Sequence, residues 1–171
     1  SAKQFFDNHK TAVLGNPVRE SLLSGILPQE ETKRVLGFNS QEPLLLFLGG
    51  SLGSERINDF VLNNLEELIK DFQILHQTGI SNYQSVKNEA AVILKDYLEE
   101  EKARYQLIGF FEKNYKDDLA AADLIISRAG GGIIFEIASF GKPSILIPLK
   151  EAASDHQKLN AYEYADTKAA I

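Results

Sequence analysis

Five short apolar runs, with helical patterns between them, constrain the fold of this chain more than any other feature. Each is a continuous run of hydrophobic residues rather than an alternation, which is typical of strands buried on both faces of a sheet. Several end in glycine, where a strand turns toward the next helix. This alternation predicts a doubly wound, parallel α/β sheet of the Rossmann-like kind. The expected strands are residues 44–48, 72–77, 106–111, 124–127 and 144–149.

The segments between these runs have the spacing of amphipathic helices, and Ser54 is expected to cap the first of them. The chain before residue 41 is less regular, with a turn at Gly15-Asn16-Pro17 and a short helix at residues 28–33. We therefore expect residues 1–40 to be an interdomain segment that leads into one domain, residues 41–171. The expected helices of that domain are residues 54–70, 84–103, 116–122, 132–140 and 153–166.

Composition excludes several classes of function. The net charge of −6 argues against a nucleic-acid-binding protein, which usually carries a basic surface. The chain has no cysteine, and its three histidines lack the spacing of metal ligands. No apolar run is long enough to cross a bilayer, and the polar amino-terminus does not have the pattern of a signal peptide. We expect a soluble domain that binds an anionic small ligand through backbone N–H groups and local dipoles.

The segment after the first run, residues 49–54, reads Gly-Gly-Ser-Leu-Gly-Ser. Glycine lets the backbone approach a phosphate closely, and a helix that follows presents unpaired N–H groups to an anion. Ser51 and Ser54 add two hydroxyl groups. The spacing matches neither a Walker loop nor a strict Gly-x-Gly-x-x-Gly motif, so a plain turn with a serine cap is equally compatible with it.

A second glycine-rich segment, Gly130-Gly131-Gly132, precedes another expected helix. Glu136 follows about one turn into that helix, where its carboxylate would accept hydrogen bonds from two ribose hydroxyl groups. The alternative is an ordinary acidic residue in a first turn, which interacts favourably with the helix dipole. Spacing alone leaves both interpretations open.

Further polar side chains occur near the fifth run and near the amino-terminus. Gln157 and Asn160 are three residues apart, so they share one helix face, and amides suit sugar hydroxyls. His156 beside them is more typical of a surface residue than of a catalytic base. Arg19 is a weak indication of a phosphate or base contact. With no catalytic triad or marked carboxylate pair, the residues indicate binding of a phosphorylated, hydroxyl-rich ligand.

Six segments, in this order, resemble the carboxyl-terminal half of the MurG family of GT-B glycosyltransferases. They are GNPVRE, LGGSLGSERIN, HQTG, AADLIISRAGGGIIFE, GKPSILIPL and DHQKLNA. The resemblance implies two Rossmann-like domains across a cleft, of which this chain is the donor-binding one. The amino-terminal acceptor domain and a carboxyl-terminal tail would lie outside this sequence. The implied enzyme is an inverting hexosyltransferase that moves N-acetylglucosamine from UDP-N-acetylglucosamine (UDP-GlcNAc) to lipid I. It makes lipid II for peptidoglycan at the cytoplasmic face of the bacterial cell membrane.

The resemblance also implies roles for single residues. Arg19 would lie near the nucleotide, Ser51 would contact the diphosphate, and the backbone of Phe111 would meet the uracil. Glu136 would bind the ribose hydroxyls, and Gln157 would contact the sugar. No metal, cofactor or catalytic base is expected in this chain, so it should bind the donor without transferring the sugar alone. The full expected set of donor-binding residues is Arg19, Ser51, Phe111, Gly131, Gly132, Ile133, Ile134, Phe135, Glu136, Gln157 and Asn160.

Three positions depart from the family pattern. Leu52 stands where glutamine is common, Ile133 ends a Gly-Gly-Ile segment where Ala-x-Thr is common, and His156 stands where a second glutamine is common. They bear on the sugar selectivity of the site. Two other functions stay open: the donor domain of a different UDP-sugar transferase, and a split, non-catalytic donor subunit recruited by a membrane partner. An epimerase of the same fold would need acid–base carboxylates that the sequence does not show.

Overall fold

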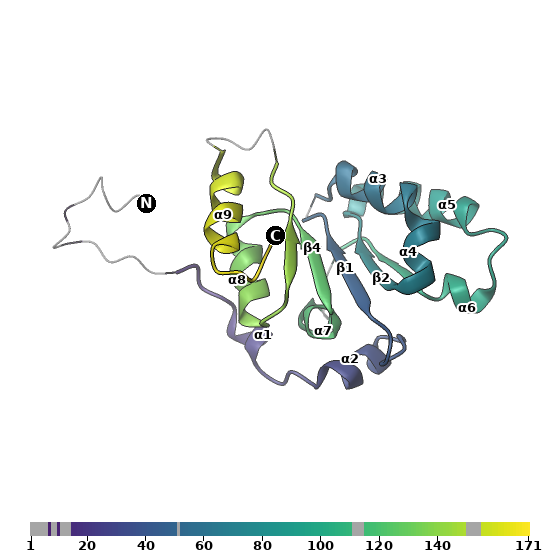
Figure 1. The fold of residues 1–171 in the computed structure, drawn as a ribbon, viewed down its shortest axis with the longest axis horizontal. Helices are drawn as coiled ribbons and strands as arrows, with labels where there is room; N and C mark the ends of the chain where they lie inside the picture. The colour runs from purple at the N-terminus through teal and green to yellow at the C-terminus, as the bar shows by residue number, and fades with distance from the viewer. Residues whose placement is uncertain (1–6, 8–9, 11–14, 51, 111–114, 150–154) are drawn as a thin grey trace.

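Five parallel strands form one sheet in the order β3-β2-β1-β4-β5 (Figure 1). The computed structural model describes residues 7, 10, 15–50, 52–110, 115–149 and 155–171. The doubly wound parallel sheet expected from the sequence is confirmed, and three of its strands are shorter than the apolar runs that predict them. The strands are β1 (Leu44–Leu48), β2 (Gln73–Gln77), β3 (Tyr105–Ile108), β4 (Leu124–Ser127) and β5 (Ser144–Leu146).

Helices cover both faces of the sheet (Figure 1). No helix in the described part of the chain is both long and apolar enough to cross a membrane. The α-helices are α1 (Glu20–Leu23), α2 (Gln29–Val35), α3 (Glu55–Asn63), α4 (Leu65–Asp71), α5 (Tyr83–Ile93), α6 (Glu99–Lys102), α7 (Tyr115–Ala121), α8 (Gly131–Ser139) and α9 (His156–Ala165), with a 3₁₀ turn, η2 (Ile80–Asn82), before α5.

Two of the expected long helices are wrong as single elements. The first breaks at Asn64, whose φ of −118° and ψ of 10° are not helical and whose side-chain amide donates to the carbonyl of Phe60 at 2.7 Å. The second ends at Ile93 and resumes as the short helix α6. Ser54 does stand at the cap position of α3, but its side chain makes no capping hydrogen bond.

The core consists of two apolar layers, one on each face of the sheet. Strand side chains alternate between the layers, since successive residues of a strand point to opposite faces. Leu46 and Ile125 face α7 and α8, where Ile137 is fully buried. Phe47 and Ile74 face α3, α4 and α5 on the other side. Because β1 is covered from both sides, all five of its residues are buried.

Helix α2 is attached to the amino edge of the sheet by polar contacts. Gln29 Nε2 donates to Asp123 Oδ1 at 2.8 Å and to the carbonyl of Ala122 at 3.0 Å. Lys33, whose side chain is only 4% exposed, forms an ion pair with the same aspartate. Asp123 Oδ2 also accepts the backbone N–H of Leu44 at 2.7 Å, which ties α2 to the start of β1. The segment before residue 41 therefore includes a helix that packs on the domain.

Candidate functional site

The candidate site lies at the carboxyl edge of the sheet, between β1 and β4. These two strands are neighbours, while the chain leaves them to opposite sides of the sheet, toward β2 and toward β5. Open parallel sheets bind ligands in the crevice at such a switch point. The loops that follow the two strands are the two glycine-rich segments singled out in the sequence.

The first of these loops is clamped by Gln77, the buried last residue of β2. The backbone N–H of Gly50 donates to Gln77 Oε1 at 3.0 Å, and Gln77 Nε2 donates back to the carbonyl of Gly50 at 2.7 Å. Gly53, further along the loop, has a φ of +80°, and a Cβ there would lie 2.1 Å from the carbonyl oxygen of Thr78. Only glycine fits this backbone conformation and this close approach.

A buried hydrogen-bond network supports the loop from below. Asn58 Nδ2 donates to the carbonyl of Thr78 at 3.1 Å, so its Oδ1 is left to accept the Nε2–H of His76 at 3.0 Å. The Nδ1 of His76 then accepts the hydroxyl of Tyr105 at 2.9 Å. Burial lowers the pKa of His76 to about 3. The histidine is a neutral structural residue that links β2 and β3 to the start of α3.

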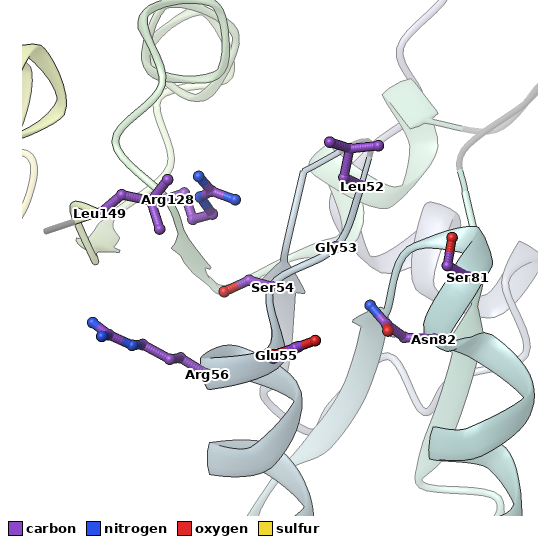
Figure 2. Close-up of a pocket in the computed structure, with 9 residues that line it drawn as sticks. All are labelled: Leu52, Gly53, Ser54, Glu55, Arg56, Ser81, Asn82, Arg128 and Leu149. Atoms are coloured by element: carbon purple, nitrogen blue, oxygen red, sulfur yellow. The ribbon is translucent and has the colours of Figure 1, made fainter. Parts of the chain in front are cut away.

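A cavity of about 430 Å³ opens between this loop and the end of β4 (Figure 2). The guanidinium groups of Arg56 and Arg128 and the hydroxyl of Ser54 border it. Burial lowers the pKa of Arg128 from its ordinary value of 12.5. Among the described residues neither arginine forms an ion pair, and the two arginines outnumber the one carboxylate of the lining, Glu55. Its lining is Leu52, Gly53, Ser54, Glu55, Arg56, Ser81, Asn82, Arg128 and Leu149.

A second cluster of polar side chains surrounds Glu136 in α8. Its Oε2 accepts the hydroxyl of Tyr115 at 2.7 Å, and its Oε1 lies 3.7 Å from Nη2 of Arg19. The Arg19 side chain is 67% exposed and that of Glu136 is 20% exposed. The structure thus brings together two predicted ligand-binding residues from opposite ends of the chain, and it adds a tyrosine that the sequence did not single out.

Two amide side chains, those of Asn160 and Asn16, lie at the first turn of α8. Asn160 Nδ2 donates to the carbonyl of Ala129 at 3.2 Å, just before the helix begins. A Cβ at Gly131 would lie 3.4 Å from the Nδ2 of Asn16 and 3.8 Å from that of Asn160, so two amides face the same turn. Gln157 Oε1 accepts the backbone N–H of Leu149 at 3.1 Å, which holds α9 against the end of β5.

The other predicted residues either lie outside the described part of the chain or are apolar and glycine residues of α8. Ser51 and Phe111 lie outside the described residues. Ile134 is buried among the apolar side chains of the core, and the partly buried Ile133 packs against it. Gly132 and Phe135 are exposed on α8.

Sequence reasoning gave no role to Tyr115, Gln77, Asn16 or Arg128. Gln77 is the last residue of the expected strand 72–77 and Arg128 directly follows the run 124–127, so their position at a strand end was a usable signal. Tyr115 and Asn16 had no such signal, because their contacts come from elements far away in the sequence.

The strand order and the position of the two glycine-rich turns define a Rossmann-like α/β domain. The sequence profile described as glycosyltransferase family 28 C-terminal domain matches residues 44–171. The chain belongs to this family.

Curated relatives and a solved structure agree with the assignment. The UDP-N-acetylglucosamine–N-acetylmuramyl-(pentapeptide) pyrophosphoryl-undecaprenol N-acetylglucosamine transferase of Clostridium tetani is 33% identical over 94% of this chain and 41% of the relative. The Bacteroides fragilis protein of the same name is 37% identical over 99% of this chain and 43% of the relative. The chain therefore spans about two fifths of the length of these relatives. The crystal structure of Acinetobacter baumannii MurG is 28% identical, with a TM-score of 0.67 over 94% of this chain and 43% of that one. These comparisons confirm the resemblance to the MurG family.

Proposed function

We propose that this chain binds UDP-GlcNAc as the donor half of an inverting glycosyltransferase that adds N-acetylglucosamine to lipid I and so makes lipid II. The observation that carries the proposal is the grouping, at one edge of the sheet, of a carboxylate suited to a diol with two glycine-rich turns suited to phosphates. The names of the curated relatives support the choice of donor and acceptor.

The ribose is assigned to Glu136. A carboxylate accepts hydrogen bonds from two adjacent hydroxyls, and bonds to a charged acceptor are stronger than bonds between neutral groups. The Arg19 guanidinium is exposed and sits 3.7 Å from Glu136, so it can turn toward the nucleotide base or the phosphate without disturbing the core. The sugar is assigned to the amide groups of Gln157 and Asn160 on α9.

The diphosphate is assigned to the turns after β1 and β4. In a direct displacement, negative charge grows on the leaving UDP as the acceptor hydroxyl attacks the anomeric carbon. The backbone N–H groups at the first turn of α8 and the side chain of Arg128 would stabilise that charge, because donors held in place beforehand need no reorganisation during the reaction. This assignment requires neither a metal nor a cofactor.

The remaining parts of the reaction are assigned to segments beyond this chain. We propose that a second domain binds lipid I at the cytoplasmic face of the membrane and supplies the catalytic base. The isolated chain would then bind the donor but would not transfer the sugar.

Calorimetric titration of the purified chain with UDP-GlcNAc tests the donor assignment, with UDP-glucose and ADP as comparison ligands. We expect binding that prefers the N-acetyl sugar. Glu136→Ala should weaken it about 10- to 100-fold, the loss expected for hydrogen bonds to a charged group. Glu89→Ala, which removes an exposed carboxylate on α5 far from the site, is the matched control and should change nothing.

The comparison ligands separate the possible errors. A preference for UDP-glucose would indicate a transferase for a different sugar, and the departures at Leu52 and His156 would then be the first positions to exchange. Absence of UDP-GlcNAc binding by a folded chain, and also by the full-length protein that contains it, would contradict the proposal.

A further inference from the structure

The two oxygens of the Glu136 carboxylate have unequal partners. Oε2 accepts the Tyr115 hydroxyl at 2.7 Å, a short and well-formed hydrogen bond. Oε1 has an exposed arginine 3.7 Å away, which is an ion pair and not a close hydrogen bond. Tyr115 is the first residue of α7 and Glu136 lies in α8, so the short bond connects two separate helices.

Tyr115 is a permanent donor in this pair. Burial raises the pKa of its phenol well above the ordinary value, and the hydrogen bond to Glu136 raises it further. The hydroxyl therefore keeps its proton over the whole physiological pH range. A neutral donor of this kind restrains the carboxylate without removing its charge.

The hydrogen bond to Oε2 of Glu136 also restricts the orientation of Oε1. A glutamate side chain on a helix surface samples several rotamers, and ordering it upon ligand binding costs conformational entropy. With Oε2 fixed to α7, the plane of the carboxylate is set before a ligand arrives. The side chain remains 20% exposed, so a ligand can still reach it. A group that is ordered in advance binds more tightly than one that must be ordered on binding.

We propose that Tyr115 is a positioning residue, which holds Glu136 in the orientation that recognises the ribose diol of a bound nucleotide. The inference rests on the proposed function, because it takes Glu136 as the group that contacts the ribose. It adds a residue from a different helix that would decide how strongly the site distinguishes a ribonucleotide from its deoxy analogue.

The test removes the Tyr115 hydroxyl from the protein and the ribose hydroxyls from the ligand, separately and together. The chain and its Tyr115→Phe variant, which lacks only the phenolic hydroxyl, are titrated with UDP and with 2′,3′-dideoxy-UDP. We expect Tyr115→Phe to weaken UDP binding about 5- to 10-fold, the size of one lost hydrogen-bond effect. Binding of the dideoxy analogue should change by less than about twofold, because this ligand gives Glu136 nothing to recognise.

Tyr97→Phe is the matched control. The Tyr97 hydroxyl also donates to a glutamate, Glu66 Oε1 at 3.2 Å, but on the opposite face of the sheet. This variant should bind both ligands as the unaltered chain does.

Each other outcome is informative. Equal weakening for UDP and for the dideoxy analogue would show that Tyr115 supports the fold and does not position Glu136, which overturns the inference. No weakening for either ligand would overturn it as well, while the proposed function would stand. If the unaltered chain binds UDP but does not distinguish it from the dideoxy analogue, Glu136 does not read the ribose and the inference fails. If the folded chain and the full-length protein bind no UDP, the proposed function fails with it.

Discussion

Among single residues, His76 is the clearest case of a group that looks functional and serves the structure. It is fully buried, and both ring nitrogens are used, one by Tyr105 and one by Asn58. A buried imidazole with two neutral partners is stable only in its uncharged form. The network therefore couples the glycine loop to protonation, through Asn58 and the carbonyl of Thr78.

The depressed pKa of His76 predicts acid sensitivity. In the unfolded chain the pKa is about 6.5, and in the folded chain it is about 3. The contribution of the neutral histidine to stability is present above pH 6.5 and is lost as the pH falls toward 3. Between pH 7 and pH 4 the chain should lose about 3 kcal/mol of unfolding free energy relative to a His76→Gln variant.

Urea unfolding at a series of pH values measures this difference. Burial raises the pKa of Asp118 to about 7, which has the opposite effect in the same window. Since Asp118 is present in both proteins, its contribution cancels when they are compared. Stability curves that run parallel from pH 7 to pH 4 would contradict the assignment of His76.

The residue types of the site were predictable, but their partners were not. Glycine before a helix and a carboxylate one turn later are local patterns, so Gly131 and Glu136 could be selected from spacing. The roles of Tyr115 and Gln77 depend on contacts across 21 and 27 positions. No local pattern contains such a contact, because the fold creates it.

At the scale of elements, strands were predicted better than helices. Runs buried on both faces leave little choice of structure, and β1 and β4 have the predicted bounds. The helix breaks at Asn64 and after Ile93 were missed because apolar spacing continues across them: Leu65 is buried beyond the first break, and Leu94 beyond the second.

The loop after β1 gives a prediction at this scale. Gly53→Ala should destabilise the chain by about 2 kcal/mol or more, since alanine disfavours a φ of +80° and its Cβ would collide with the carbonyl of Thr78. Gly132→Ala is the control: it lies within α8 with no atom near the new Cβ, and should be neutral or stabilise the chain by up to about 1 kcal/mol. Thermal unfolding compares the two variants, and equal shifts in Tm would contradict the argument.

Across the described part of the molecule, helix α2 and the sheet form one packed body. The change in regularity at residue 41 marks the start of the sheet, yet α2 before it contributes a buried lysine and a glutamine to the amino edge. A sequence pattern shows where regular alternation begins. It does not show which irregular segments pack against it, and here the polar contacts of Asp123 decide that.

Removal of the Asp123 carboxylate should therefore destabilise the whole domain. Asp123→Ala leaves the buried Lys33 without its charged partner, with only the carbonyl of Glu42 as an acceptor, and leaves the Leu44 N–H without its acceptor. We expect a loss of about 2–3 kcal/mol, less than for a fully buried pair because the aspartate side chain is 40% exposed. Asp96→Ala, which removes an exposed ion pair with Lys95, should change stability by less than about 0.5 kcal/mol. Urea unfolding measures both, and a loss for Asp123→Ala no larger than for Asp96→Ala would show that α2 is not held by this network.

Because the strands are parallel, they all begin at one edge of the sheet and all end at the opposite edge. The two glycine-rich turns of the candidate site follow β1 and β4, so the turns that precede these strands lie at the opposite edge of the sheet. Gln41, exposed just before β1, lies at the edge where the strands begin. Because the chain has no cysteine of its own, a single cysteine at this position would be a unique chemical handle. A dye or a sensor surface attached there would leave the ligand-facing edge open, with every molecule held in the same orientation.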